Sequence, residues 1–136
     1  MSFKIYPTEE FKKKARKIKD IYPDFRNDLF EFAKKRKRNP LSLPGLDPLG
    51  DGLFKCRIDI TGKPAGKSFG ARIIYLMITA DNEVWVMTCY DKSDKKDLSA
   101  RELASLRLKA KAAQKSNPGS GREMLLQSIH LKKHKK

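Results

Sequence analysis

Histidine is missing from residues 1–114 of this 136-residue chain, and its two histidines, His130 and His134, lie near the C-terminal end. The imidazole group that most enzymes use for acid-base chemistry near pH 7 is therefore absent from most of the chain. The spacing of four could hold a metal on a helix, but no carboxylate or thiol stands beside the pair. We therefore expect no metal site and no cofactor, and any catalyst in residues 1–114 must use Lys, Arg, Tyr, Asp or Glu.

Long apolar runs are lacking too. No stretch approaches the length of a membrane span, and the N-terminal MSFKIYPTEEF lacks the apolar core of a signal peptide. We expect a cytoplasmic protein without a membrane partner. Only two cysteines are present, Cys56 and Cys89. Both fall inside apolar runs rather than at a metal-ligand spacing, so we interpret them as core thiols.

Acidic residues are few: 31 Lys and Arg against 16 Asp and Glu give a net charge of +15. Residues 1–114 hold 25 of the cations and 15 of the acids, a net charge of +10. This excess favours a polyanionic partner, with nucleic acid as the first candidate. We predict one domain over residues 1–114. Residues 115–136, which include the linker-like SNPGSG at 116–121, are predicted to form a basic tail, either extended or with a short amphipathic helix.

The most informative stretch is Leu53 to Lys92, which predicts three consecutive strands. In the first, Lys55 and Arg57 alternate with apolar residues, which places two cations on one exposed face of a sheet. The second strand, Ala71 to Thr79, is apolar on both faces apart from Arg72, as expected for a central strand. The third, Val84 to Tyr90, leads into Asp91 and Lys92.

Helices flank this sheet. Thr8 is a predicted N-cap for a helix over Glu9 to Ile21, and Asp24 for a second helix with an apolar stripe, which together make a hairpin. Ser99 and Glu102 form a capping box for a third helix that runs to about Ala113. Phe3 to Tyr6 suits an edge strand, and we interpret Leu41 to Gly52 as an ordered loop. The sequence thus predicts an α+β fold, with a small antiparallel or mixed sheet of three to four strands packed against an N-terminal helical hairpin and a C-terminal helix.

One motif is excluded. The segment Gly62 to Ser68, GKPAGKS, is similar to a phosphate-binding Walker loop, but that loop has four residues between its glycines and joins a strand to a helix. Here three residues separate the glycines, and the loop joins two predicted strands.

Cations are therefore the available catalysts. Metal-free cleavage of RNA needs removal of a proton from the 2′-hydroxyl, stabilisation of the charged phosphorane and protonation of the leaving oxygen. Side chains that could converge on one basic cleft are Lys55, Arg57, Lys63, Lys67, Arg72 and Lys92. Further phosphate contacts are predicted near the end of the second helix, from Lys34, Lys35, Arg36, Lys37 and Arg38, although a solvated helix face explains that run equally well.

The order of these motifs resembles the RelE/ParE superfamily of toxins, in its RelE and HigB-like branch. The most specific pieces are GKSFGARIIY at 66–75 and YDKSDKKDLS at 90–99. The resemblance implies a metal-independent, ribosome-dependent endoribonuclease that cuts mRNA, and a cognate antitoxin whose complex with the toxin can bind operator DNA. It matches Lys55 and Arg57 to the basic pair of the family, Arg72 to its transition-state arginine and Lys92 to the basic residue that closes the last strand. Lys67 matches the basic loop.

The resemblance leaves the general base open. Relatives that place a tyrosine just beyond the last strand have no counterpart here, because Tyr90 precedes Lys92. Lys55 or Lys92 is the candidate for proton transfer, Arg57 and Arg72 for phosphorane stabilisation, and Tyr90 for stacking on a base or orienting it. Two alternatives stay open, a ParE-like inhibitor of DNA gyrase and a non-catalytic RNA-binding protein on the same scaffold.

Overall fold

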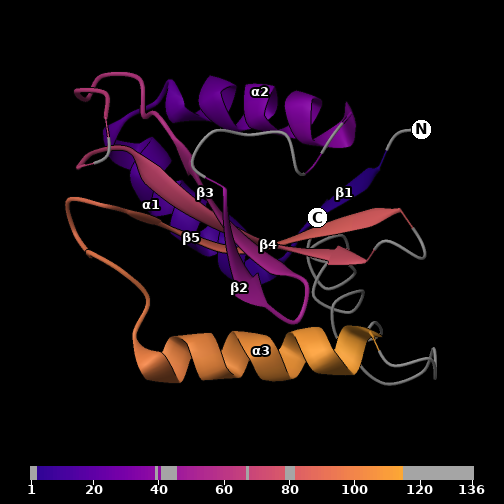
Figure 1. Ribbon diagram of the computed structural model, residues 1–136. Coiled ribbons are helices and arrows are strands. Elements are labelled where there is room, and N and C mark those ends of the chain that lie inside the picture. The colour runs from indigo at the N-terminus through magenta and orange to yellow at the C-terminus, as the bar shows by residue number, and fades with distance from the viewer. Residues whose placement is uncertain (1–2, 39, 41–45, 67, 79–81, 115–136) are drawn as a thin grey trace.

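The computed structural model describes residues 3–38, 40, 46–66, 68–78 and 82–114 (Figure 1). In chain order, the described elements are β1 (Lys4–Pro7), α1 (Glu9–Ile21), α2 (Phe25–Arg38), β2 (Asp47–Gly50), β3 (Leu53–Ile58), β4 (Ala71–Ile78), β5 (Glu83–Asp91) and α3 (Ala100–Gln114). The predicted tail, with His130 and His134, lies outside the described residues.

The strands form one mixed sheet in the order β1-β5-β4-β3-β2. Strand β1 pairs with β5 in parallel, and every other neighbouring pair is antiparallel. The predicted α+β class is confirmed, and all eight residues of the central strand β4 are buried, as its two apolar faces predicted.

The predicted strand count is too low by at least one, because the segment interpreted as a loop contains β2. Asp47-Pro48-Leu49-Gly50 is rich in residues that disfavour strands, which hides it from a pattern search. It pairs with β3 as a hairpin whose turn contains Asp51 and Gly52, both with positive φ. An Asp-Gly pair before an alternating run is a recognised hairpin signal.

Helix ends follow their local capping signals. The Thr8 hydroxyl accepts a hydrogen bond from the Phe11 backbone N–H at 3.3 Å and donates one to the carbonyl of Val86 at 2.9 Å. This cap therefore both starts α1 and attaches it to β5. At α3, the Ser99 N–H donates to Glu102 at 2.8 Å, and the Glu102 N–H donates to the Ser99 hydroxyl at 3.1 Å, which confirms the capping box.

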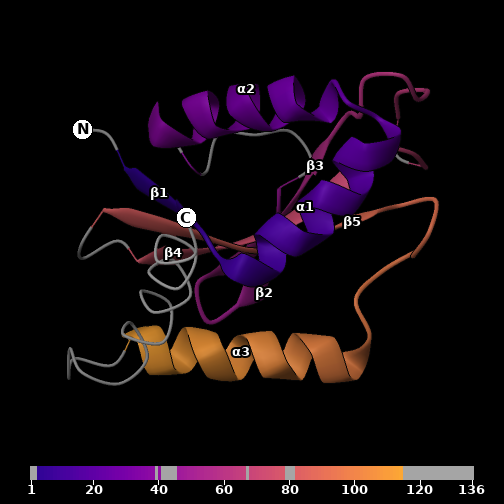
Figure 2. The same ribbon diagram turned by 180° about the vertical axis from the view of Figure 1, so that it is seen from behind.

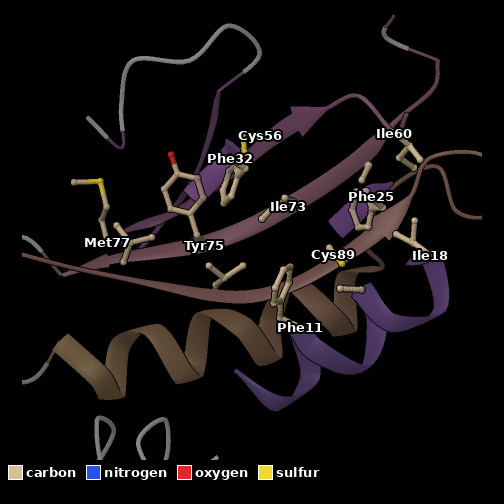
Figure 3. Packing of buried hydrophobic residues seen from close by; sticks show 14 residues of the cluster. Phe11, Ile18, Phe25, Phe32, Cys56, Ile60, Ile73, Tyr75, Met77 and Cys89 are labelled. Carbon is tan, nitrogen blue, oxygen red and sulfur yellow. The ribbon is translucent and has the colours of Figure 1, made fainter. Parts of the chain in front are cut away.

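Helices cover both faces of the sheet (Figures 1 and 2). On one face, α1 and α2 pack on β3, β4 and β5 through a core that includes Phe11, Phe25, Phe32 and Tyr75 (Figure 3). On the other face, α3 packs on Trp85, Ile74 and their neighbours. Cys56 and Cys89 are buried free thiols in the first core, as predicted.

Candidate functional site

A row of three polar side chains crosses the sheet near the start of β4. Arg57 of β3 stands opposite Arg72 of β4, which stands opposite Tyr90 of β5. Directly opposed residues of antiparallel strands project from the same face, so the three side chains lie side by side. Tyr90 packs with the α3-side core, which assigns the row to that face. The sheet register thus brings together two predicted catalytic arginines and the predicted tyrosine.

The three side chains of this row differ in how deeply they are buried. Arg57 is half-buried, while Arg72 and Tyr90 are 8% and 9% exposed. Burial lowers the pKa of the Arg72 guanidinium and the positive charge of Arg57 lowers it further, although Tyr90 and Asp97 act in the opposite sense. The Arg72 Nη1 also donates to the carbonyl of Phe69 at 2.9 Å. Two arginines held together in partial burial favour an anion placed between them and the solvent.

Asp97, in the loop between β5 and α3, connects this row to Lys55. Its Oδ1 accepts hydrogen bonds from Lys55 Nζ at 3.3 Å, from the Tyr90 hydroxyl at 3.2 Å and from the Leu98 backbone N–H at 2.8 Å. These contacts, that of Leu98 first, lower the pKa of Asp97. Lys55 also pairs with Asp47 of β2 at 3.7 Å. The predicted Lys55 therefore lies beside the row, but it is half-buried rather than exposed, because the hairpin and the loop flank it.

Asp97 was missed by the sequence reasoning, although it lies within the motif YDKSDKKDLS. That segment supported the family resemblance and the start of the capped helix, but Asp97 itself was given no role. Asp97 follows Tyr90 by seven residues, and its carboxylate accepts a hydrogen bond from the Tyr90 hydroxyl. This contact exists because the loop folds back on the strand, which the sequence does not reveal.

Lys63 belongs to a different cluster. Its Nζ donates to Asp91 at 2.6 Å and to the Ser93 hydroxyl at 2.9 Å, and it lies 5.2 Å from the centre of the Tyr22 ring. Burial lowers the pKa of Lys63, but the hydrogen bond and charge of Asp91 outweigh it and leave the pKa raised. Lys63 thus fastens the loop after β3 to the end of β5, a structural use that its predicted RNA contact did not anticipate.

Lys92 lies one residue beyond β5, at the margin of the site. Its backbone N–H donates to the carbonyl of Gly70 at 3.0 Å, and its Nζ donates to the carbonyl of Lys96. Gly70 has φ +83°, and a Cβ there would lie 2.5 Å from the carbonyl oxygen of Ile58. This close approach holds the end of β3 against the residue that precedes β4 and so fixes Arg57 beside Arg72.

The basic residues at the end of α2 do not all lie on the exposed side of the helix. Lys34, Lys35 and Arg38 are exposed, as predicted. The expected outer placement of Arg36 is wrong: this residue is 1% exposed and packs in the α2-side core. It follows Phe32 by one helical turn and so shares the apolar face of the helix. The side chain of Lys37 and all of Lys67 lie outside the described residues, and their predicted RNA contacts stay predictions.

The site has an evident chemistry. Guanidinium groups can stabilise a dianionic phosphorane, and an ammonium group beside them can donate a proton to a leaving oxygen. Among the described residues, no group of three His, Cys, Asp or Glu side chains could hold a metal ion. Nor is any helix in the described part of the chain long and apolar enough to cross a membrane.

The fold and this row define a small α+β protein with a basic site on one face of a mixed sheet. A family model described as the RelE toxin of the RelE/RelB toxin-antitoxin system matches residues 3–132, and the chain therefore belongs to the RelE toxin family. It is thus a toxin of a toxin-antitoxin system, and its family implies a cognate antitoxin as partner.

A solved structure supports the fold. A mutant of the Escherichia coli toxin RelE in the free state matches with a TM-score of 0.52 and 17% sequence identity. The alignment covers 80% of this chain and 97% of that one. No curated protein matches the sequence significantly.

Proposed function

We propose that this toxin is a metal-independent endoribonuclease that cuts mRNA on the ribosome and so stops translation. The observation that supports this activity best is the row of Arg57, Arg72 and Tyr90, with Lys55 and Asp97 beside it. It offers two guanidinium groups to one phosphate and a charged lysine next to them. An oxyanion that develops during cleavage gains most from donors already held in place.

Roles follow from the contacts. Arg57 and Arg72 stabilise the phosphorane. Lys55 lies beside the row, where its ammonium group contacts the carboxylates of Asp47 and Asp97 and carries three N–H donors. We therefore assign Lys55 the protonation of the leaving oxygen. Lys92 is the other candidate lysine, and we assign it the removal of the proton from the 2′-hydroxyl. Tyr90 is too buried for its ring to stack on a base, and we assign it the positioning of Asp97.

The surroundings of the row fit a large RNA partner. Lys34, Lys35 and Arg38 are exposed on α2 and are proposed to contact ribosomal or messenger RNA phosphates. A ribosomal target implies a cytoplasmic protein. We further propose that residues 1–114 form the toxin domain, that residues 115–136 form a basic extension, and that any contact with operator DNA is made through the antitoxin.

The test is primer extension on cellular mRNA after expression of the full chain, and on mRNA translated in a purified system. We expect cleavage that requires ribosomes and persists in a chelator. Arg72→Ala should reduce cleavage by at least about 100-fold, the scale for removal of one oxyanion donor. The matched control Arg26→Ala, at an exposed arginine of α2, should cut normally. Intact mRNA together with inhibited DNA supercoiling would assign the toxin to gyrase instead.

A further inference from the structure

Phe30 is the one exposed large hydrophobic side chain of α2 among the residues that the structure describes, and it is 64% exposed. It precedes Phe32 by two residues, which are about 200° apart around an α-helix. Its ring therefore points away from the core that contains Phe32. A single exposed ring is common at a protein surface, so the residues around Phe30 decide what it can bind.

Those residues are mainly cations. Lys34 and Arg38 follow Phe30 at intervals of four residues, which places the three side chains on one face of α2, and both cations are exposed. The Lys34 Nζ lies 5.9 Å from the centre of the Phe30 ring, within the range of a cation–π contact. Lys35 is exposed beside them, and Glu31 is the one exposed acid among the described side chains of α2. We call Phe30, Lys34 and Arg38 the Phe30 face.

The Phe30 face matches the two chemical parts of a nucleotide. A base stacks on an aromatic ring, and its phosphate binds a cation. Four residues of an α-helix rise about 6 Å, so Lys34 and Arg38 stand about 6 and 12 Å beyond Phe30 along the helix axis. Their long side chains can therefore reach the phosphates next to a base that is stacked on the ring. A protein partner would require an apolar centre, whereas the neighbours of Phe30 on this face are charged.

The sheet separates the Phe30 face from the row that contains Arg57 and Arg72. Helix α2 packs on one face of the sheet through Phe32, and the row lies on the α3 side with Tyr90. Both views show α2 and α3 on opposite sides of the sheet (Figures 1 and 2). An mRNA strand held at the row therefore leaves the Phe30 face to a second RNA segment.

We propose that the Phe30 face binds ribosomal RNA, with an unpaired base stacked on the Phe30 ring and adjacent phosphates at Lys34 and Arg38. The inference rests on the proposed function, because the ribosome supplies this second RNA segment. It assigns to the Phe30 face a part of the affinity for the ribosome and no part of the chemistry of cleavage. Stacking tolerates any base, so the contact selects an unpaired nucleotide rather than a sequence.

Affinity for the ribosome is measured on the full chain by filter binding with purified ribosomes. Phe30→Ala should weaken binding by at least about fivefold, the scale of one stacked base. Phe30→Tyr keeps an aromatic ring and should bind like the wild type. Phe30→Leu keeps apolar area without an aromatic ring and should bind as weakly as Phe30→Ala.

The matched control is Leu108→Ala, which removes a side chain that is 71% exposed on α3 and should leave binding unchanged. Wild-type affinity in Phe30→Ala overturns the proposal. So does wild-type affinity in Phe30→Leu, because the contact would then be apolar rather than stacked.

Ultraviolet crosslinking at saturating toxin identifies the partner. Irradiation of the complex should join the chain to an unpaired nucleotide of ribosomal RNA, which is detected as a stop in primer extension on that RNA. The stop should persist in Phe30→Tyr and in Leu108→Ala and should be lost in Phe30→Leu. A stop that is absent from the wild type, or that persists in Phe30→Leu, overturns the proposal.

The kinetics of mRNA cleavage separate this proposal from the proposed function. Phe30→Ala should raise the ribosome concentration at half-maximal rate and leave the rate at saturation unchanged, whereas Arg72→Ala should lower the saturated rate. Cleavage with the same half-maximal concentration in Phe30→Ala and wild type refutes the Phe30 face and leaves the nuclease. Ribosome binding that depends on Phe30, without any cleavage, keeps the Phe30 face and refutes the nuclease.

Discussion

Asp97 is the residue whose removal tests the architecture of the site most directly. It is the acceptor for the Tyr90 hydroxyl, and Tyr90 is only 9% exposed. In Asp97→Ala this hydroxyl loses its acceptor, which costs about 1–3 kcal/mol for a buried polar group. The lost ion pair with Lys55 adds about 0.2–1 kcal/mol, since the Asp97 side chain is 63% exposed. We therefore expect the free energy of unfolding to fall by about 1–4 kcal/mol.

Asp97→Asn separates the two contributions. The amide oxygen can still accept from Tyr90 and from the Leu98 N–H, so this variant should lose only about 0.2–1 kcal/mol of stability. Because the folded-state pKa of Asp97 is lowered, the charge contributes stability above the unfolded value of about 3.9 and loses it as pH falls through the folded pKa. The difference between wild type and Asp97→Asn should therefore shrink below about pH 4.

Urea unfolding measures both variants, with Asp94→Ala as the control for an exposed acid in the same loop. Asp97→Ala should also cut mRNA more slowly than Asp94→Ala, because Lys55 and Tyr90 lose their common partner. If Asp97→Ala is as stable and as active as Asp94→Ala, Asp97 does not organise the site and the reasoning fails.

Two further substitutions test the frame around the site. Gly70→Ala places a Cβ 2.5 Å from the Ile58 carbonyl and adds left-handed strain of about 1–2 kcal/mol, so it should destabilise more in urea than Gly66→Ala, which has φ +119° and open space; equal losses would refute the close approach. Glu102, whose pKa is lowered to about 2 by the Lys95 hydrogen bond and the Ser99 N–H, stabilises the fold above its unfolded pKa of about 4.3. The stability lost in Glu102→Gln should therefore fade as pH drops from about 4 toward 2, and a difference that is constant with pH would contradict this assignment.

Local signals explain what the sequence predicted well. Thr8 and the Ser99-Glu102 box act on backbone groups within one turn of helix, so their effect is visible in the sequence. The apolar residues on both faces of β4 likewise predict a central strand, because both faces must be covered. These signals were sufficient for the α+β class.

The pairing of strands that are distant in the chain could not be predicted from the sequence. The alignment of Arg57, Arg72 and Tyr90 depends on strand register, including an irregularity between Ile74 and Tyr75 that no local pattern encodes. The parallel pairing of β1 with β5 is set by packing across the whole chain. The wrong placement of Arg36 has a different cause. Its helical spacing from Phe32 indicated the buried face, but its charge favoured an exposed position.

The buried thiols give this protein two internal reporters of motion. Cys56 lies beside Arg36 in the layer of α2, and Cys89 lies near Lys14 of α1. Burial raises the pKa of each thiol to about 12, so neither is a reactive thiolate at neutral pH in the closed fold. An alkylating reagent can therefore modify each cysteine only when the helix above it moves away. Labelling rates of the two sites would show, without any engineered probe, whether α1 and α2 open together or separately.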